Sequence, residues 1–408
     1  MTTELHISRR SLLFASLLVV VLFSSCFVSM SSSEISLFAT GAADTVVVSN
    51  ETALRNAVNN AQTGKALTIT FDKDITLTNK PLTISANKDI TLTSNKASGF
   101  YKLTGANGVS TVIVDGNGQL KLDGIIVTHT NFEGPKFGGG IYVEANGRLI
   151  MYSGEISENS AAGGRSSTQQ SAGGGVYVLG VFELHGGKIA NNIAYEDYDG
   201  STRSGGYGGG VFVSGGGSFS MFGGEISDNR AEAVGGGVSN GGAFTMSGGK
   251  IIANTAYLSG GGGGVNNAGV FTMSGGEISG NAGGGVRNHE SFTMSGGKIV
   301  NNGDRAWGGG VTNSGTFKKL GGVISGNTPV DVYPSDGNDS SSGDGSPDEN
   351  NGLFNDDGGV PADNGEVVVG VLSLSDVLFI CIGVAVVVVG VVVAVLFFTY
   401  KKRAGNTK

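Results

Sequence analysis

The sequence predicts an all-β protein whose central part is a parallel β-helix, a solenoid in which each coil of chain stacks on the previous one. Three observations predict this fold. A phrase of about two dozen residues occurs seven times, 73 of the 408 residues are Gly, and each phrase holds three short apolar runs bounded by Gly or Asn. Because Gly costs about 1 kcal/mol in a helix, a helical repeat is disfavoured. Three strands per coil, each paired with the same strand of the next coil, fit the pattern.

Every phrase keeps the same residues at the same offsets. It begins with Leu or Phe, and Gly follows five, Ile seven and Asn ten residues later. The first positions are Leu149, Phe182, Phe219, Phe244, Phe271, Phe292 and Phe317. Residues at equal offsets should stack about 4.8 Å apart, with the Phe, Met and Ile columns inward and the Asn residues in ladders. Roughly eleven coils from about Thr45 to Asn327 would form a rod on the order of 50 Å long.

The residue before each Ile alternates in charge through six phrases. The column reads Glu155, Lys188, Glu225, Lys250, Glu277, Lys298 and Val323. Like charges on neighbouring strands repel and opposite charges attract, so the alternation indicates parallel, in-register stacking. We interpret these residues as an outward structural ladder and not as acids or bases for catalysis.

The first 43 residues are typical of a signal peptide. Arg9 and Arg10 precede an apolar run, Leu12 to Phe23, and small residues lead to a cleavage site after Ala43. The alternative is an uncleaved N-terminal anchor. Residues 44–137 are predicted to form an N-terminal cap and the first coils.

In this N-terminal region, alternating strands follow a short capping helix. Ala53, Leu54, Ala57 and Val58 have helical spacing behind the polar Asn50. The helix should cover the open first coil, whose unpaired strand edge would otherwise be exposed. Residues 138–330 hold the seven repeats, and their length varies between Asn and the next Gly-rich strand. Insertions should therefore leave the coil at one corner.

The C-terminal part is predicted to anchor the rod to a membrane. Residues 331–370 form an acidic segment that cannot bury a core and should be a disordered linker. Residues 377–400 are apolar and long enough for a transmembrane helix. The tail 401–408 begins Lys401-Lys402-Arg403, which favours a cytoplasmic tail with the ectodomain outside the cell membrane. Glycosylation at Asn50 or Asn338 is left open.

Composition argues against several functions. The net charge of −8 disfavours nucleic acid as a partner. Cys26 and Cys381 both lie in apolar terminal segments, so no disulfide or thiol chemistry is expected between them. The acidic linker does not have the Ca²⁺-loop spacing, and we predict no metal and no cofactor.

One group of residues is a candidate binding site. The second residue of the Gly-rich strand is aromatic in the first three repeats, and the two longest insertions belong to the same repeats. The candidates are Tyr142, Tyr177, Phe212, Tyr195, Tyr198 and Tyr207. Aromatic surfaces beside carboxylates can hold sugar rings. The alternative is that the insertions fold over the aromatic residues as a small satellite core.

Signals for catalysis are weak. Polysaccharide-cleaving β-helices need outward carboxylates on adjacent coils. Here the outward columns hold Thr, Ser and the alternating Glu and Lys residues of the charge ladder, whose charges neutralise one another. We interpret His185 and His289 as substitutions that the repeat tolerates at their positions, and not as catalytic residues. His129 lies before the repeats and has no evident partner in the sequence. The Gly triplets lack the context of a phosphate loop. We therefore predict no catalytic residue.

The Gly-rich strand, as in Gly235 to Val238, and the phrase Phe271 to Asn281 resemble the repeats of polymorphic outer-membrane proteins. They are also similar to adhesin-like surface proteins of methanogenic archaea and gut microbes. The resemblance covers roughly Thr45 to Asn327. It implies a right-handed, single-stranded parallel β-helix displayed on a cell surface. The expected function is a non-enzymatic adhesin for glycans or proteins of host or neighbouring cells. The alternatives are a pectate lyase-like or galacturonase-like enzyme and a passive surface coat.

Overall fold

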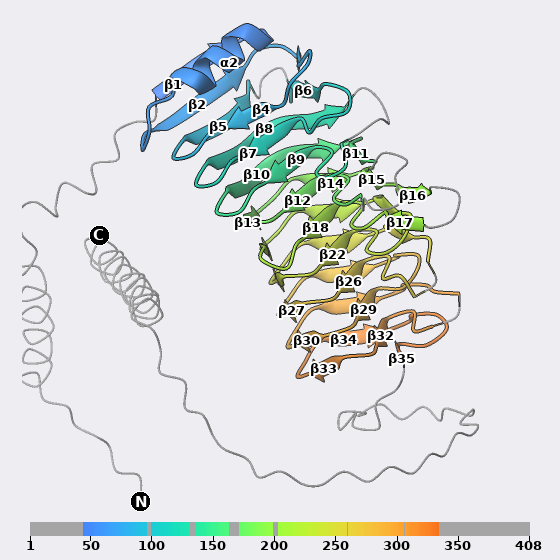
Figure 1. The fold of residues 1–408 in the computed structure, drawn as a ribbon. Helices are drawn as coiled ribbons and strands as arrows, with labels where there is room; N and C mark the ends of the chain where they lie inside the picture. Colours follow the sequence, from blue (N-terminus) through green and yellow to red (C-terminus); the bar gives the residue numbers. More distant parts are fainter. Residues whose placement is uncertain are drawn as a thin grey trace, which may run out of the picture. The chain divides into compact units, whose positions relative to one another are not determined.

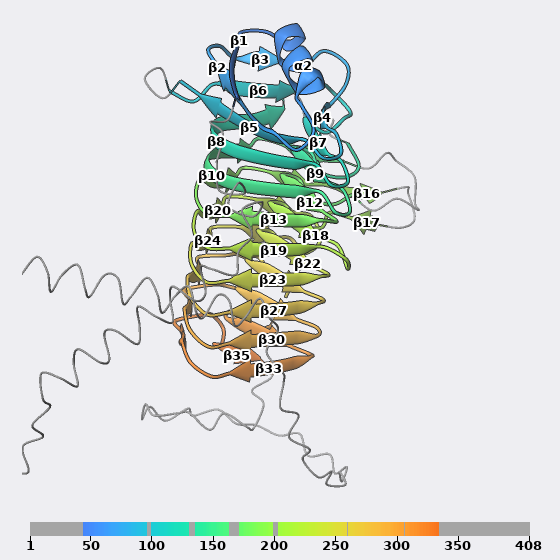
Figure 2. The same cartoon turned by 90° about the vertical axis from the view of Figure 1, so that its left-hand side faces the viewer.

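The computed structural model describes residues 44–95, 99–129, 135–162, 171–198, 203–258, 260–305 and 307–333. The predicted signal peptide 1–43, transmembrane helix 377–400 and tail 401–408 lie outside these residues, as does the linker beyond residue 333, and they stay predictions. In the described ranges, no helix is long and apolar enough to cross a membrane. Those ranges form an all-β solenoid of stacked parallel strands, as predicted from the repeats (Figures 1 and 2).

A short helix covers the N-terminal end of the solenoid. β1 (Asp44–Val48) leads into α2 (Glu51–Asn60), and the Asn50 side chain caps the helix by accepting a 2.9 Å hydrogen bond from the Ala53 amide. Leu54 and Val58 are buried against the first coil. Figure 1 shows α2 across this end, which agrees with the predicted capping helix. The helix thereby removes apolar side chains of the first coil from water.

The coils before the repeats contain the alternating strands that were predicted to follow the capping helix. Their pairing is parallel and continues into the repeats through β8. The strands are β2 (Ala66–Phe71), β3 (Ile75–Thr76), β4 (Leu82–Ile84), β5 (Asp89–Ser94), β6 (Lys102–Gly105), β7 (Val112–Val114) and β8 (Gln119–His129).

Each repeat contributes a strand from its Gly-rich segment and a strand from the start of its phrase. The strands of the Gly-rich segment are β9 (Ile141–Val143), β12 (Val176–Val178), β18 (Val211–Val213), β22 (Val238–Asn240), β26 (Val265–Asn267), β29 (Val286–Asn288) and β32 (Val311–Asn313). After the last repeat, β35 (Val332–Tyr333) pairs with β32. The strands at the start of the phrase are β10 (Arg148–Ser157), β13 (Val181–Leu184), β19 (Ser218–Met221), β23 (Ala243–Met246), β27 (Val270–Met273), β30 (Ser291–Met294) and β33 (Thr316–Lys319).

The Ile strands follow the phrase-start strands across a two-glycine corner, and β10 spans both positions in the first repeat. They are β14 (Lys188–Ala190), β20 (Glu225–Ser227), β24 (Lys250–Ile252), β28 (Glu277–Ser279), β31 (Lys298–Val300) and β34 (Val323–Ser325). A fourth, shorter set follows the Asn residues: β11 (Ser160–Ala161), β15 (Ile193–Ala194), β21 (Arg230–Ala231) and β25 (Thr255–Ala256). In all four sets, equal offsets pair in parallel register.

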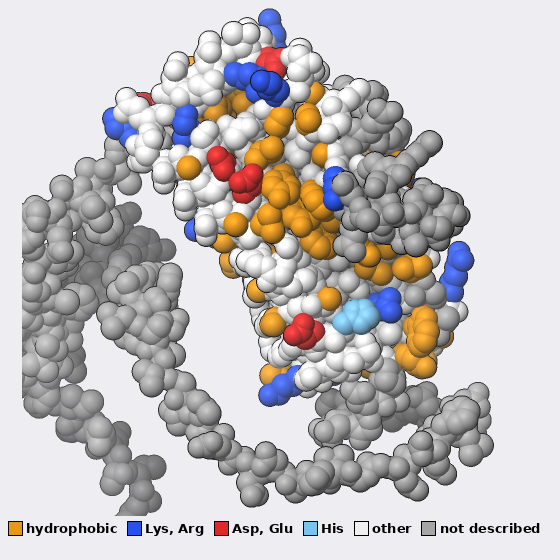
Figure 3. Space-filling model, viewed as in Figure 1, with side chains coloured by type: hydrophobic (Ala, Val, Ile, Leu, Met, Phe, Trp, Pro, Cys, Tyr) orange, Lys and Arg blue, Asp and Glu red, His pale blue; other side chains and the backbone are white. Residues whose placement is uncertain are grey.

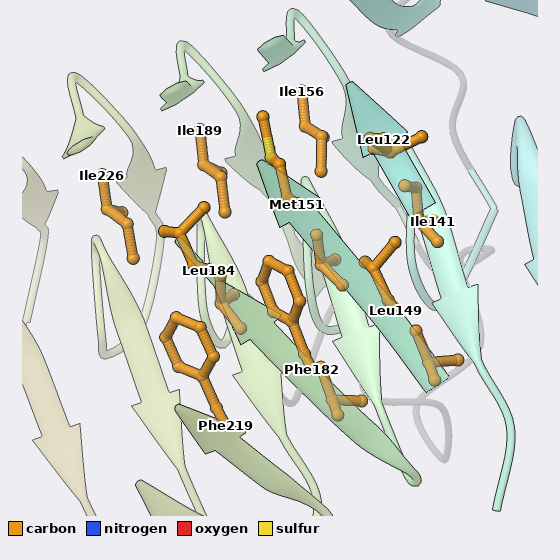
Figure 4. Close-up of a cluster of buried hydrophobic side chains, with 14 of the residues drawn as sticks. Leu122, Ile141, Leu149, Met151, Ile156, Phe182, Leu184, Ile189, Phe219 and Ile226 are labelled. Carbon is orange, nitrogen blue, oxygen red and sulfur yellow. The ribbon is translucent and has the colours of Figure 1, made fainter. Parts of the chain in front are cut away.

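The core consists of side-chain columns that run along the solenoid. The Phe rings stack from Phe182 to Phe317 with centroids 4.6–4.9 Å apart. The Met and Ile columns are buried beside them, and Figure 4 shows Phe182 and Phe219 with Ile189 and Ile226 in the interior. The glycine before the Ile strand adopts a left-handed conformation, as at Gly249 (φ +80°), where a Cβ would lie 2.6 Å from Met221 Cε. That corner therefore requires Gly.

The Asn residues form a buried hydrogen-bonded ladder. In each coil the Asn Nδ2 and main-chain N–H donate to the Asn Oδ1 of the next coil, as Asn229 does to Asn254 at 2.9 and 3.0 Å. The ladder ends at Asp331, whose Oδ1 accepts from Asn327 Nδ2 at 2.7 Å. All amide groups point their N–H ends toward this carboxylate, so its charge complements their aligned dipoles.

His129 lies at the other end of the Asn ladder, which supplies the partners that the sequence left unidentified. Its Nδ1 lies 3.3 Å from Asn159 Oδ1 and 3.0 Å from Thr111 Oγ1. Its Nε2 lies 2.8 Å from the Val109 carbonyl, which can only accept, so Nε2 carries a proton. The buried imidazole therefore has a structural role at the start of the ladder.

The charge ladder has the predicted register. Glu155, Lys188, Glu225, Lys250, Glu277, Lys298 and Val323 occupy paired positions in successive Ile strands. Lys188 Nζ lies 3.2 Å from Glu225. Partial burial alone would raise the pKa of Glu225, but hydrogen bonds from Ser227 and Lys188 and the charges of Lys188 and Lys250 outweigh it and lower this pKa.

Reversing one charge of the ladder should destabilise the protein more than removing it. Lys250→Glu places three carboxylates on consecutive coils, whereas Lys250→Ala leaves two that are separated by a neutral residue. Exposed pairs contribute less than about 1 kcal/mol each and are screened by salt. We expect Lys250→Glu to melt at a lower temperature than Lys250→Ala in low salt, with the difference shrinking in high salt. Equal melting temperatures at low salt would contradict the ladder.

The insertions leave the coil at one corner, between the short strands after Asn and the Gly-rich strands. Phe137, Ala172 and Tyr207 form parallel bridges there, and so do Ala282 and Gly303 in later coils. The second insertion contains an antiparallel hairpin, β16 (Glu196–Tyr198) with β17 (Arg203–Gly205). The prediction that length variation is confined to one corner is thus confirmed in the described residues.

Candidate functional site

Three of the predicted site residues form one column on the outside of the Gly-rich sheet. Tyr142, Tyr177 and Phe212 are paired in register on β9, β12 and β18, and we call them the aromatic stripe. Their ring centroids are 5.2 and 5.0 Å apart and the rings are stacked. Phe137 packs on Tyr177 at 4.8 Å. Figure 3 shows hydrophobic side chains gathered in the middle of the visible face.

The stacking limits what the aromatic stripe can offer a ligand. Tyr177 has a ring on each face, and the next residues of the column, Ser239 and Asn266, are buried. Tyr177 therefore presents its edge and its hydroxyl to a ligand, and not an open face. Burial raises the pKa of Tyr177, while a hydrogen bond with Ser214 acts in the opposite direction. The exposed edge and hydroxyl are features of a binding surface. The enclosed ring faces are features of the satellite core, the alternative interpretation.

The other predicted residues are distributed differently. Tyr207 belongs to the bridge column that includes Phe137, next to the stripe. Tyr195 lies beyond the corner, where burial raises its pKa against the charge of Arg230 and together with that of Glu232. The Tyr198 main chain is part of β16, but its side chain lies outside the description. The structure thus groups Tyr142, Tyr177 and Phe212 and places Tyr195 in another column.

A pair of carboxylates beside the stripe was missed in the sequence. Asp115 and Glu144 follow the paired residues Val114 and Val143, and the Glu144 amide donates to the Val114 carbonyl at 2.9 Å. Burial raises the pKa of Glu144, and so do its hydrogen bond with Asp115 and the charge of that residue. Burial also raises the pKa of Tyr142, with Tyr177 and Glu144 adding to it.

The sequence did contain a signal for this pair. A Val, an acidic residue and Asn-Gly recur at the same spacing in 114–118 and 143–147. The first of these segments lies before the seven repeats, so the fixed offsets of the repeats do not extend to it. Outward carboxylates on adjacent coils therefore exist, which corrects the expectation that outward columns hold only Thr, Ser and the ladder.

The geometry of the pair bears on what it can do chemically. Its two carboxyl groups lie close enough for Asp115 to raise the pKa of Glu144. The pair is suited to accepting hydrogen bonds from a ligand. In the described ranges, no cluster of three or more His, Cys, Asp or Glu residues could hold a metal ion.

The proton that Glu144 holds at its raised pKa predicts a pH dependence of stability. Because the folded protein binds this proton more tightly than the unfolded chain, the pair adds stability below the ordinary Glu pKa of about 4.3. That stability is lost as pH rises through the raised pKa. Glu144→Gln should therefore raise the melting temperature slightly at pH 7 and change it little at pH 4. A shift of the same size at both pH values would contradict the raised pKa of Glu144.

Comparison with protein-family models, curated proteins and solved structures finds no match for this chain. The structural class of this protein is therefore inferred from its own sequence and structure. The described part is a parallel β-solenoid that carries an outward aromatic column and a carboxylate pair on adjacent coils.

Proposed function

We propose that this chain is a cell-surface protein, adhesin-like, that binds glycans or proteins of host or neighbouring cells. In this proposal residues 1–43 direct export and residues 377–400 anchor the protein as a single-pass membrane protein with its ectodomain outside. The resemblance of its repeats to polymorphic outer-membrane proteins and archaeal or gut-microbe adhesin-like proteins supports this role. No cofactor, metal or nucleic acid takes part.

One observation carries the binding proposal: Tyr hydroxyls, aromatic edges and a carboxylate pair converge on adjacent coils. Tyr142 is close enough to Glu144 for the carboxylate to raise its pKa, and Tyr177 stacks on Tyr142. Sugars present both hydroxyl groups and apolar patches, so they can use all three kinds of group at once. We propose that Asp115 and Glu144 accept hydrogen bonds from sugar hydroxyls while the stripe packs against the ring.

The proposal is tested by presenting the full chain in detergent to a glycan array and titrating the hits. Tyr142→Phe removes the hydroxyl and keeps the stacked ring. We expect it to weaken binding by about five- to tenfold, because one hydrogen bond is worth about 1 kcal/mol. Arg287→Ala, in the same column two coils beyond Ser239, is the control and should bind normally.

The same experiment separates the alternatives. Cleavage of a bound glycan would make the chain a carbohydrate-active enzyme. Binding to cells without binding to glycans would point to a protein ligand. A chain that binds neither would be a passive coat, and one whose binding is unchanged by Tyr142→Phe and Glu144→Gln would use another site.

A further inference from the structure

A second aromatic column lies on the first three repeats, outside the aromatic stripe. Tyr152, His185 and Phe222 each occupy the third position after the first residue of the phrase. Their ring centroids are 5.3 and 4.7 Å apart. Tyr152 is 47% and Phe222 50% exposed, so this column is open to solvent. His185, interpreted from sequence as a tolerated substitution, is its middle ring.

This outer column is held in place by polar contacts and by a bulge. His185 Nε2 lies 3.2 Å from Glu183 Oε2, and Glu183 also pairs with Arg148. The pairing of β10 with β8 shifts register between Met151 and Ser153, so Tyr152 is an extra residue without a partner. A bulge redirects a side chain, as it does beside many binding sites.

At the end of the outer column, the aromatic side chains give way to small, exposed side chains, which the aromatic stripe does not show. After Phe222 the same position is held by Ser247, Ser274 and Ser295, all of them exposed. Stacked rings lie across the solenoid axis, so the outer face of Phe222 looks toward the small side chain of Ser247. In the stripe the equivalent neighbour, Ser239, is buried. The Phe222 face is therefore an aromatic face that a flat ligand can reach.

Hydroxyl-bearing side chains continue from Phe222 along the solenoid. Thr245, Thr272 and Thr293 are paired in successive coils, two residues before the exposed Ser column. Thr245 Oγ1 donates to Ser220 Oγ at 3.1 Å. The charge ladder on the other side of the corner alternates Glu and Lys, so it offers no net charge to attract an ionic ligand.

We propose that this face is a second glycan-binding site, specific for neutral sugars, in which one sugar ring stacks on the outer face of Phe222. Hydroxyl groups of that sugar and its neighbours bond to Ser247 and Thr245, and the chain of sugars runs along the Thr and Ser columns. The proposal rests on the proposed glycan-binding function for its ligand class, but it uses different residues and a different face. An aromatic face paired with uncharged hydroxyls complements a neutral sugar ring.

The experiment titrates the full chain in detergent with a β-1,4-linked glucose hexasaccharide and, for comparison, a galacturonic acid hexasaccharide. Phe222→Ser restores the residue of later repeats and should weaken binding of the glucose hexamer by about five- to tenfold. Ser247→Phe should weaken it as much, because the new ring covers the Phe222 face. Arg287→Ala, on the Gly-rich sheet and outside the Thr and Ser columns, is the control and should bind normally.

These variants separate the second site from the stripe. Loss in Phe222→Ser and Ser247→Phe with normal binding in Tyr142→Phe supports the second site alone. Loss in Tyr142→Phe with normal binding in both Phe222→Ser and Ser247→Phe overturns it and leaves the proposed function standing. It is also overturned if the glucose hexamer does not bind at millimolar concentration, or if the acidic hexamer binds more tightly.

Discussion

Phe271→Ala is expected to destabilise the protein by about 3–5 kcal/mol, the usual cost of removing a large buried aromatic side chain. Phe271 is fully buried and stacks between Phe244 at 4.7 Å and Phe292 at 4.6 Å. Its removal leaves a cavity between two rings whose main chains are fixed by the sheet, so the gap cannot close by a local shift. Urea unfolding followed by circular dichroism measures the loss.

Phe317→Ala provides the control for this cavity. Phe317 is the last ring of the column among the described coils, touches Phe292 at 4.9 Å, and is partly exposed. It should cost clearly less than Phe271→Ala, because less apolar surface returns to water and less space is left empty. Equal losses for the two substitutions would show that the column is not a continuous core.

Asn254→Ala is expected to cost about 3 kcal/mol or more. Its Oδ1 accepts from the main-chain and side-chain N–H groups of Asn229, and its Nδ2 donates to Asn281 Oδ1 and to the carbonyls of Ile226 and Ile252. The Asn229 main-chain N–H loses its Asn254 acceptor, and a buried N–H without a partner costs about 1–3 kcal/mol where no water enters. Asn229 Nδ2, Asn281 Oδ1 and the Ile252 carbonyl keep one other hydrogen bond each, so each lost bond there costs about 0.5–1.5 kcal/mol. Chemical denaturation measures the change.

Asn266→Ala is the matched control for the ladder. Asn266 is also buried, but it has one long contact, from Nδ2 to Ser239 Oγ at 3.4 Å, and its Oδ1 has no partner. Removing it should cost little or stabilise the protein, since a buried unsatisfied oxygen disappears. If Asn254→Ala and Asn266→Ala lose the same stability, the hydrogen bonds of the ladder do not stabilise the coils.

The repeat period explains why much of the fold could be predicted. The repeats that begin at Phe271 and Phe292 carry the same residue types at the same distances from their first residue. This fixes the register of neighbouring coils, because a slip by one residue would turn every side chain to the opposite face. The capping helix was equally accessible, since Asn50 and the spacing of Leu54 and Val58 are local signals. The chain outside the described residues stays a prediction.

The candidate site was predictable only in part. Alternation in β9 and β12 indicated that Tyr142 and Tyr177 point outward, but not that their rings would stack and enclose their own faces. Asp115 lies before the repeats, so their fixed offsets do not pair it with Glu144. The partners of His129 come from a coil whose sequence does not repeat. Tyr152, His185 and Phe222 share an offset, and comparing that offset across the repeats would have found them.

The central claim is that equal offsets stack in adjacent coils, because both candidate sites depend on it. Thr245 and Thr272 are paired in neighbouring coils, about 4.8 Å apart and within the roughly 4.4–6.8 Å span of a disulfide. With Cys26 and Cys381 changed to Ser, Thr245→Cys with Thr272→Cys should form a disulfide rapidly on mild oxidation of the folded protein. Thr245→Cys with Thr293→Cys, two coils apart at roughly 9.6 Å, should not. Equal rates for the two pairs would contradict the account.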